Sequence, residues 1–174
     1  GTDGQLQWHY PVEGDQAALY SSLVDCNGNI YFGTSGISDS CGFYSISSSG
    51  RLNWKYDGLI APEPTMDLRG HLFFETVLRE CKLTSIDFQG NLRWQMTLPN
   101  GGNLAPYVCD REGIIYVCAA NSVNAYDNNG NLLWSVPLTA KATRVACPAI
   151  GYDGTLYVGT RVNPLIESKL YAIE

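Results

Sequence analysis

Four copies of one short motif constrain the fold of this chain more than any other feature. Each copy reads Gly-x-Leu-x-Trp, and together the copies use every tryptophan in the 174 residues. They occupy Gly4–Trp8, Gly50–Trp54, Gly90–Trp94 and Gly130–Trp134. Successive tryptophans, at positions 8, 54, 94 and 134, are separated by intervals typical of a propeller blade and too long for most leucine-rich repeats. The spacing predicts a repeat protein with one structural unit per copy.

Two further motifs recur between the tryptophans. The first is a turn glycine followed by a strand that is apolar on both faces, and its copies begin at Gly28, Gly70, Gly113 and Gly154. The second is a strand with a small central residue, which is Ser45, Ser85, Ala125 or Ala172. A strand that is apolar on both faces must be covered on both sides. Turns such as Asn27-Gly28 and Ser49-Gly50 are hairpin signals, in which glycine supplies a positive φ.

These motifs predict an all-β propeller of four-stranded antiparallel blades, with four blades in the single domain 1–174. The expected repeats are 9–54, 55–94, 95–134, and 135–174 closed by a strand at 4–8. Proline at 64, 106 and 148 favours a sheet edge, so the first strand of each blade should line the central channel. Leu and Trp of the first motif are two residues apart, so we expect them to share a buried face worth about 2–3 kcal/mol per tryptophan.

The segments Pro148–Gly154, Thr155–Thr160, Leu170–Glu174 and Ala125–Trp134 carry a resemblance to a known family. Together they resemble the pyrroloquinoline-quinone-like repeat of the BamB and quinoprotein dehydrogenase propellers. This resemblance implies the fold, an eight-bladed ring, and a location outside the cytoplasm in the periplasm, on the cell surface or secreted. It transfers no activity, because one fold hosts many functions.

Ring closure is predicted from the order of the strands. The sequence starts on a Gly-x-Leu-x-Trp strand and ends on the strand Leu170–Glu174, and inside the chain strands of these two types are neighbours in the opposite order. Two chains could therefore meet head to tail in an eight-bladed homodimer. The chain could also be a fragment of a longer propeller, or close on itself as a four-bladed monomer. The family resemblance favours eight blades.

Charge and composition restrict the classes of partner that the chain is expected to bind. The formal charge is −6 with scattered Lys and Arg, so no nucleic-acid partner is expected. No apolar run approaches the roughly 20 residues of a membrane-spanning helix, so no membrane span is expected. The six cysteines follow no disulfide or zinc spacing, and we interpret most of them as small buried side chains.

The sequence predicts no catalytic residue, no metal site and no cofactor. His9 and His71 have no metal-ligand or triad company in the sequence. Asp25–Asn29 and Asp127–Asn131 only distantly resemble calcium loops and are interpreted as plain turns. The resemblance implies that a quinone site would need an adjacent cysteine pair, and no two cysteines here are adjacent.

The connections between the second and third strands vary in length, and variable loops on a rigid frame are the usual binding surface. The longest are Ser35–Gly42 and Arg161–Lys169, in the first and last blades, which ring closure would make neighbours. We expect a ligand or partner patch there, formed by Asp39, Arg161, Asn163 and Glu167. The second candidate is the channel mouth, with Glu63, Asn103 and Arg144. The predicted function is a non-catalytic scaffold that binds a protein or glycan, and the alternative is a degenerate or partial quinone-dependent oxidoreductase.

Overall fold

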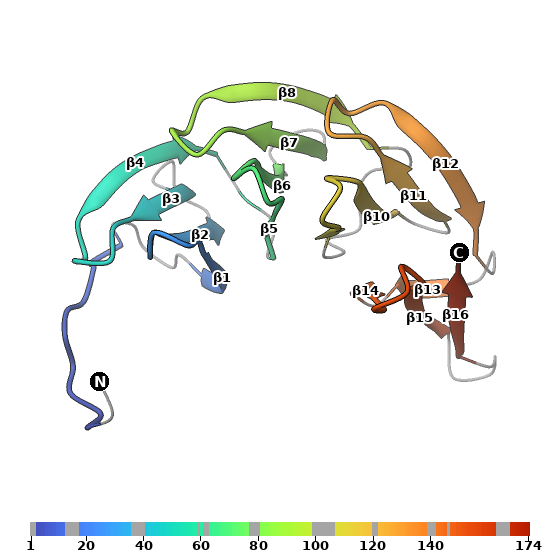
Figure 1. The fold of residues 1–174 in the computed structure, drawn as a ribbon, viewed down its shortest axis with the longest axis horizontal. Helices are drawn as coiled ribbons and strands as arrows, with labels where there is room; N and C mark the ends of the chain where they lie inside the picture. The colour runs from blue at the N-terminus through green and yellow to red at the C-terminus, as the bar shows by residue number, and fades with distance from the viewer. Residues whose placement is uncertain are drawn as a thin grey trace.

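In the computed structural model, four antiparallel sheets follow one another along an open arc (Figure 1). The structure describes residues 3–12, 18–35, 41–58, 60, 63–76, 81–98, 107–119, 122–138, 142–145, 147–162 and 168–174. These residues contain no helix, so none that could cross a membrane. The predicted all-β propeller class with antiparallel blades is confirmed.

Each sheet is one blade, and the strands follow the chain. Blade 1 contains β1 (Ala18–Val24), β2 (Ile30–Ser35), β3 (Gly42–Ile46) and β4 (Leu52–Asp57). Blade 2 contains β5 (Thr65–Met66), β6 (Leu72–Thr76), β7 (Lys82–Ile86) and β8 (Leu92–Thr97). Blade 3 contains β9 (Tyr107–Cys109), β10 (Ile115–Ala119), β11 (Ser122–Tyr126) and β12 (Leu132–Pro137). Blade 4 contains β13 (Ala142–Val145), β14 (Ala149–Ile150), β15 (Leu156–Val162) and β16 (Lys169–Ile173).

The strands β1, β5 and β14 lie on the concave side of the arc, and the fourth strand of blades 1 to 3 forms the convex rim (Figure 1). The predicted inner-edge position is therefore confirmed for these strands. Pro64 and Pro148 directly precede β5 and β14, whereas Pro106 lies outside the described residues. In blade 4 both β13 and β14 pair with one side of β15, and β16 pairs with its other side.

The hydrophobic core lies between the blades. One cluster joins blades 1 and 2 through residues such as Phe43 and Phe74, whose rings stack 4.5 Å apart. A second joins blades 2 and 3, and a third joins blades 3 and 4. Every residue of β6 is buried, as expected for a strand covered on both faces. The stability of each blade therefore depends on its neighbours.

The prediction that Leu and Trp of the Gly-x-Leu-x-Trp motif share a buried face is wrong. Leu52 pairs with Ile46 and Trp54 pairs with Ser45, so the register shifts by one residue between them. Blades 2 and 3 have the same shift. Such a bulge inserts an extra residue and re-aims the side chains after it. Leu52 is consequently exposed on the rim, while Trp54 is half-buried against the next blade.

Gly4–Trp8, predicted as the closing strand of the fourth repeat, forms no strand within this chain. The segment runs away from blade 1 at one end of the arc, and β16 lies at the other end (Figure 1). Leu6 is 81% exposed, against 47% for the equivalent Leu52. The physical reason is that no neighbouring strand is within reach to complete a backbone ladder.

Candidate functional site

The predicted loop patch falls largely outside the residues that the structure describes. Asp39, Asn163 and Glu167 lie there, as does Asn103 of the predicted channel mouth. Arg161 is described, but it lies in β15, which extends to Val162, so its expected place in a loop is wrong. Likewise Ser35, Gly42 and Lys169 belong to strands rather than to the predicted loops. Blades 1 and 4 lie at opposite ends of the arc, so a shared patch stays a prediction (Figure 1).

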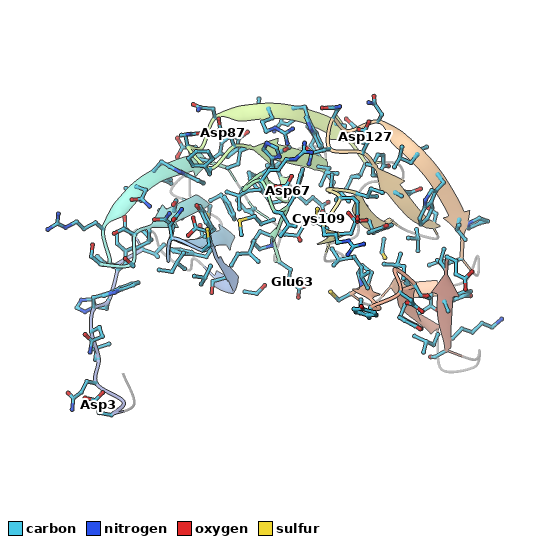
Figure 2. The ribbon with its side chains drawn as sticks, in the orientation of Figure 1. Asp3, Glu63, Asp67, Asp87, Cys109 and Asp127 are labelled. Atoms are coloured by element: carbon cyan, nitrogen blue, oxygen red, sulfur yellow. The ribbon has the colours of Figure 1, made fainter. Side chains whose placement is uncertain are left out.

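Two residues predicted for different sites share one sheet. Arg144 in β13 is the cross-strand partner of Arg161 in β15. Glu63 precedes β5 on the concave side of the arc (Figure 2). Its φ of 77° is a conformation that is uncommon outside glycine and costs about 1 kcal/mol or more. Glu63 precedes β5 and Arg144 lies in β13, and their predicted place at a channel mouth stays a prediction.

Seven short turns of the described residues lie on one face of the arc, and we call it the turn face. It holds the turns between first and second strands and between third and fourth strands, because antiparallel strands return to the same side. They comprise 25–29, 67–71, 110–114, 151–155, 47–51, 87–91 and 127–131. Their repeated carboxylates are used internally. Asp25 Oδ1 accepts from the backbone N–H groups of Asn27 and Asn29, and its Oδ2 accepts from the Asn29 amide and the Tyr31 hydroxyl.

These bonds set the charge state of the turns. Burial alone would raise the pKa of Asp25, but hydrogen bonds from Asn29, Tyr31 and Asn27 outweigh it and hold the pKa below its ordinary value. Asp87 and Asp127 make the same bonds to Asn91 and Asn131. These carboxylate oxygens already accept hydrogen bonds from donors in their own turn, as in an Asx-turn. This geometry supports the plain-turn interpretation of the two calcium-like segments.

Three of the four tryptophans make one recurring contact on this face, and two of these contacts join neighbouring blades. Nε1 of Trp8, Trp54 and Trp94 donates to the carbonyl of Ser48, Phe88 and Asn128, at 3.0, 2.9 and 2.9 Å. Each indole also covers the glycine two residues beyond that carbonyl. A Cβ on Gly50, Gly90 or Gly130 would lie 2.7, 2.8 or 3.3 Å from the ring. We call this arrangement the Trp–Gly seat.

The two halves of a fourth Trp–Gly seat are Trp134 in β12 and Gly4 near the N-terminus. Trp134 contacts Tyr116 within blade 3, and among the described residues no carbonyl accepts from its indole. Gly4 has a φ of 70°, close to the 81–88° of the three seated glycines, yet nothing lies within 4 Å of where its Cβ would be. The described residues therefore include a tryptophan without a glycine and a preformed glycine without a tryptophan.

The junction between blades 2 and 3 is closed by a polar network on the turn face. The Asn128 amide of blade 3 donates to Asp67 Oδ2 of blade 2 at 2.6 Å. The Arg93 guanidinium donates to Asn128 Oδ1 at 2.6 Å and to the Ser85 hydroxyl at 2.9 Å. Asp67 Oδ2 also lies 2.7 Å from Nδ1 of His71. His71 thus has a carboxylate partner that the sequence did not reveal, although the described residues hold no group of three metal-ligating side chains.

Asp67 is buried, but its charge is stabilised. Burial alone would raise the pKa of Asp67, and the hydrogen bonds from His71 and Asn128 outweigh this and lower the pKa. Cys109 lies near Asp67 in the middle of the arc (Figure 2). Burial and the Asp67 charge raise the pKa of Cys109 to about 12. The thiol beside this His–Asp pair therefore stays protonated at neutral pH and is a poor nucleophile.

The junction between blades 1 and 2 is open. Phe88 of blade 2 occupies the turn position that Asn128 occupies in blade 3, and a phenyl ring cannot bridge to Asp25 as Asn128 bridges to Asp67. A cleft of about 320 Å³ remains. It is lined by Val24, Asp25, Cys26, Asn27, Met66, Asp67, Leu68, Arg69, Gly70 and Phe88. We call it the blade 1–2 cleft.

A second cleft, of about 730 Å³, lies between blades 3 and 4 at the corresponding place. Its lining is more polar and includes Asp110, Arg111, Glu112 and Asp153 beside the exposed Tyr152. The described residues contain no turn after β16 that could cover it as Asn128 covers the junction of blades 2 and 3. Its openness therefore follows from the same unfilled blade edge as the unseated Trp134.

A buried carboxylate lies between blades 2 and 3. Glu75 is 1% exposed and stands where the other repeats have Gly33, Cys118 and Gly159. The Tyr107 hydroxyl donates to its Oε2 at 2.6 Å, and among the described residues its Oε1 has no hydrogen-bond partner. Burial of the Cys81 thiol, its hydrogen bond to Glu75 and the negative charge of Glu75 together raise the pKa of Cys81 to about 11.

Comparison with known proteins places this geometry in a family. The sequence model of the family described as outer membrane protein assembly factor BamB matches residues 44–174, which is most of the chain. The chain belongs to this BamB family. The resemblance predicted from the repeat motifs is thereby confirmed. No curated protein sequence matches this BamB-family chain significantly.

Solved structures share the fold of the BamB-family chain at low identity. BamB from Moraxella catarrhalis has a TM-score of 0.55 at 20% identity, with 83% of this chain and 46% of that chain covered. The gluconolactonase XC5397 from Xanthomonas campestris has 0.64 at 14% identity, covering 89% and 57%. The computationally designed Ika4 protein has 0.68 at 15% identity, covering 98% and 99%. The BamB-family chain thus spans about half the length of the natural propellers and nearly all of the designed one.

Sequence reasoning missed the clefts and the polar network of this BamB-family chain. The signal was present in the positions where the repeats differ. Ser48, Phe88 and Asn128 are equivalent, as are Gly33, Glu75, Cys118 and Gly159. Loop length does not reveal these features, because the residue at a single turn position decides whether a junction is open.

Proposed function

We propose that this chain is a non-catalytic interaction module that acts outside the cytoplasm as part of a closed ring, which two copies form head to tail. The observation that carries the proposal is the divided fourth Trp–Gly seat. Two seats join neighbouring blades of the chain, a third fixes the segment 4–8 to blade 1, and Trp134 and Gly4 are the two halves of a fourth. Trp134 of one copy would cover Gly4 of the second copy, and a symmetric pair would form two such seats.

The strand edges support the same pairing. The third strands β3 and β7 are almost wholly buried beneath a fourth strand, whereas β16 is largely exposed. If the register of β3 and β4 is repeated, Ile173 would stand opposite Leu6 of the second copy and Ala172 opposite Trp8. An open sheet edge is a template for strand addition, and the unpaired segment 4–8 has the matching motif.

Membership of the BamB family supports the scaffold role and the extracytoplasmic location, and a protein or glycan is the expected kind of partner. The similar structures include both BamB and a gluconolactonase, and at this identity they inform on fold alone. The alternative, a degenerate quinone-dependent oxidoreductase, lacks sequence support because no two cysteines are adjacent. Adding the quinone and Ca²⁺, followed by absorbance and dye-reduction measurements, separates the two: turnover would establish the enzyme.

The assembly is tested by the mass of the 174-residue chain in solution. Light scattering after size exclusion should give twice 19.1 kDa. Gly4→Val should give a monomer, because a side chain at Gly4 meets nothing within one chain but blocks the proposed seat. Trp8→Ala should also weaken assembly, by releasing the segment from blade 1, while the exposed Asp3→Val serves as the matched control. A monomeric wild-type chain at high micromolar concentration, or dimeric Gly4→Val, would overturn the ring.

A further inference from the structure

We propose that the blade 1–2 cleft docks a protein segment in which an apolar or aromatic side chain stands next to a carboxylate. This inference rests on the proposed role of the chain as an interaction module and assigns that role a site on the turn face. The site shares no residue with the loop patch expected from the sequence. It also differs from the strand edges that would close the ring.

Apolar side chains from separate elements converge at this cleft. Val24 ends β1, Met66 ends β5, Leu68 is in the turn of blade 2, and Phe88 is in the next turn of that blade. Leu68 is 82% exposed and Phe88 is 55% exposed. A cluster of exposed apolar side chains around a hollow is typical of an interaction site, whereas single exposed ones are not.

The backbone of Phe88 is held in place, because its carbonyl accepts a hydrogen bond from the Trp54 indole. A phenylalanine side chain also has few rotatable bonds, so little conformational entropy is lost when a partner packs on it. The equivalent Asn128 uses its amide to close its own junction, so the cleft depends on the single difference between Phe88 and Asn128.

Asp25 and Asp67 keep their negative charges at the cleft, but their oxygens are occupied by hydrogen bonds, so the charged lining group with free hydrogen-bonding capacity is Arg69. The oxygens of Asp25 accept four hydrogen bonds from their own turn. Those of Asp67 accept from its turn, His71 and Asn128. The exposed Arg69 lines the cleft, and among the described residues it has no ion-pair partner. The complementary group is a carboxylate on the partner, which a guanidinium binds in two-pronged fashion.

The volume fits the same occupant. A cleft of about 320 Å³ lies at the small end of the range for ligand pockets and accommodates one large side chain with part of its backbone. A glycan would leave the exposed Leu68 and Val24 without apolar partners, so the lining favours a protein segment. The apolar side chain of the partner would pack on Phe88 and Leu68. Its neighbouring carboxylate would pair with Arg69.

Titration of the ¹⁵N-labelled full chain with capped hexapeptides tests the site by NMR. The probe is Gly-Gly-Phe-Glu-Gly-Gly. Its controls are the same peptide with Gln in place of Glu and the same peptide with Ser in place of Phe. We expect saturable amide shifts at Asn27, Leu68, Arg69 and Gly70, with a dissociation constant of about 1 mM or below. The Gln peptide should bind about threefold more weakly, and the Ser peptide should cause no saturable shifts.

Variants give the test a second readout. Arg69→Ala should weaken the Glu peptide about threefold and leave the Gln peptide unchanged, because only the former places a carboxylate near the guanidinium. Phe88→Asn should abolish binding of both by closing the junction as Asn128 does, and Arg111→Ala is the matched turn-face control. No shifts at the cleft, shifts centred on Arg111 and Tyr152, or a response to cellohexaose alone would each overturn the inference. Because the mass measurement tests the ring separately, a dimer that ignores the peptides refutes only this site.

Discussion

The indole of Trp54 lies so close to Gly90 of the next blade that a Cβ on this glycine would be 2.8 Å from the ring. Its Nε1 donates to the Phe88 carbonyl at 2.9 Å in the same turn. The contact joins two blades through one side chain and a stretch of bare backbone. Glycine is required at position 90 for two separate reasons, the approach of the indole and a φ of 88°.

The two reasons can be separated by substitution. Gly90→Ala should lower the free energy of unfolding by about 2–3 kcal/mol, because it combines the cost of a positive φ with displacement of the indole. Gly154→Ala is the control, since Gly154 has a φ of 89° but no atom within 4 Å of a Cβ, and it should cost only about 1 kcal/mol. Urea unfolding of the two variants measures the difference. Equal losses would show that the indole moves aside freely.

Much of the fold was predictable because the same pattern of turn glycines and apolar strands recurs in every repeat. The turn glycines at 28, 50, 130 and 154 have the positive φ that the hairpin signals require. The apolar faces of the second strands also indicated blades covered on both sides. What the pattern could not show is the bulge between Leu52 and Trp54, because alternation assumes an unbroken register.

The candidate site was less predictable for a related reason. The difference between an open and a closed junction lies in whether the side chain at position 88 or 128 can hydrogen-bond to a carboxylate of the preceding blade. That carboxylate, Asp67, is 61 residues from Asn128 in sequence, and only the blade stacking brings the two together. Loop length carries no information on such a pair. Comparing equivalent positions across repeats would have singled out Phe88 and Glu75 as departures.

Acid should destabilise the chain partly through Asp67. Its pKa in the folded chain is lowered, because hydrogen bonds from His71 and Asn128 outweigh burial. A carboxyl with a lowered folded-state pKa contributes stability above its ordinary pKa of about 3.9, and this contribution is lost as the pH falls through the folded-state value. Asp67→Asn should therefore flatten the pH dependence of stability below about pH 4.

Urea unfolding of Asp67→Asn at several pH values between neutrality and acid tests this expectation. Glu112→Gln is the control, because Glu112 is an exposed surface carboxyl paired with Arg111. It should leave the slope nearly unchanged. An acid slope of Asp67→Asn equal to that of the unsubstituted chain would mean that the network with Asn128 contributes nothing to folding.

Glu75 and Tyr107 should be strongly coupled across the junction of blades 2 and 3. Tyr107→Phe removes the donor at 2.6 Å and leaves the buried carboxylate without that hydrogen bond. This should cost about 1–3 kcal/mol. Replacing both residues, with Glu75→Leu and Tyr107→Phe, removes the pair without stranding either group and should recover most of that loss. A double-mutant cycle by urea unfolding checks the coupling, and simply additive losses would contradict it.

Thiol labelling should distinguish the six cysteines by burial and charge state. Cys26 is exposed at a turn tip, whereas Cys41 and Cys118 are buried. Burial first, and then the nearby Cys147, raises the pKa of Cys118 to about 12, so its thiolate is scarce at neutral pH. Cys147 is exposed as a residue, but partial desolvation of its thiol, and then the charge of Glu63, raise its pKa too.

A chromogenic disulfide reagent at mildly alkaline pH should therefore react fastest with Cys26, and Cys26→Ser should abolish the fast phase. Persistence of that phase in Cys26→Ser would require another cysteine to be far more accessible than the blade packing allows.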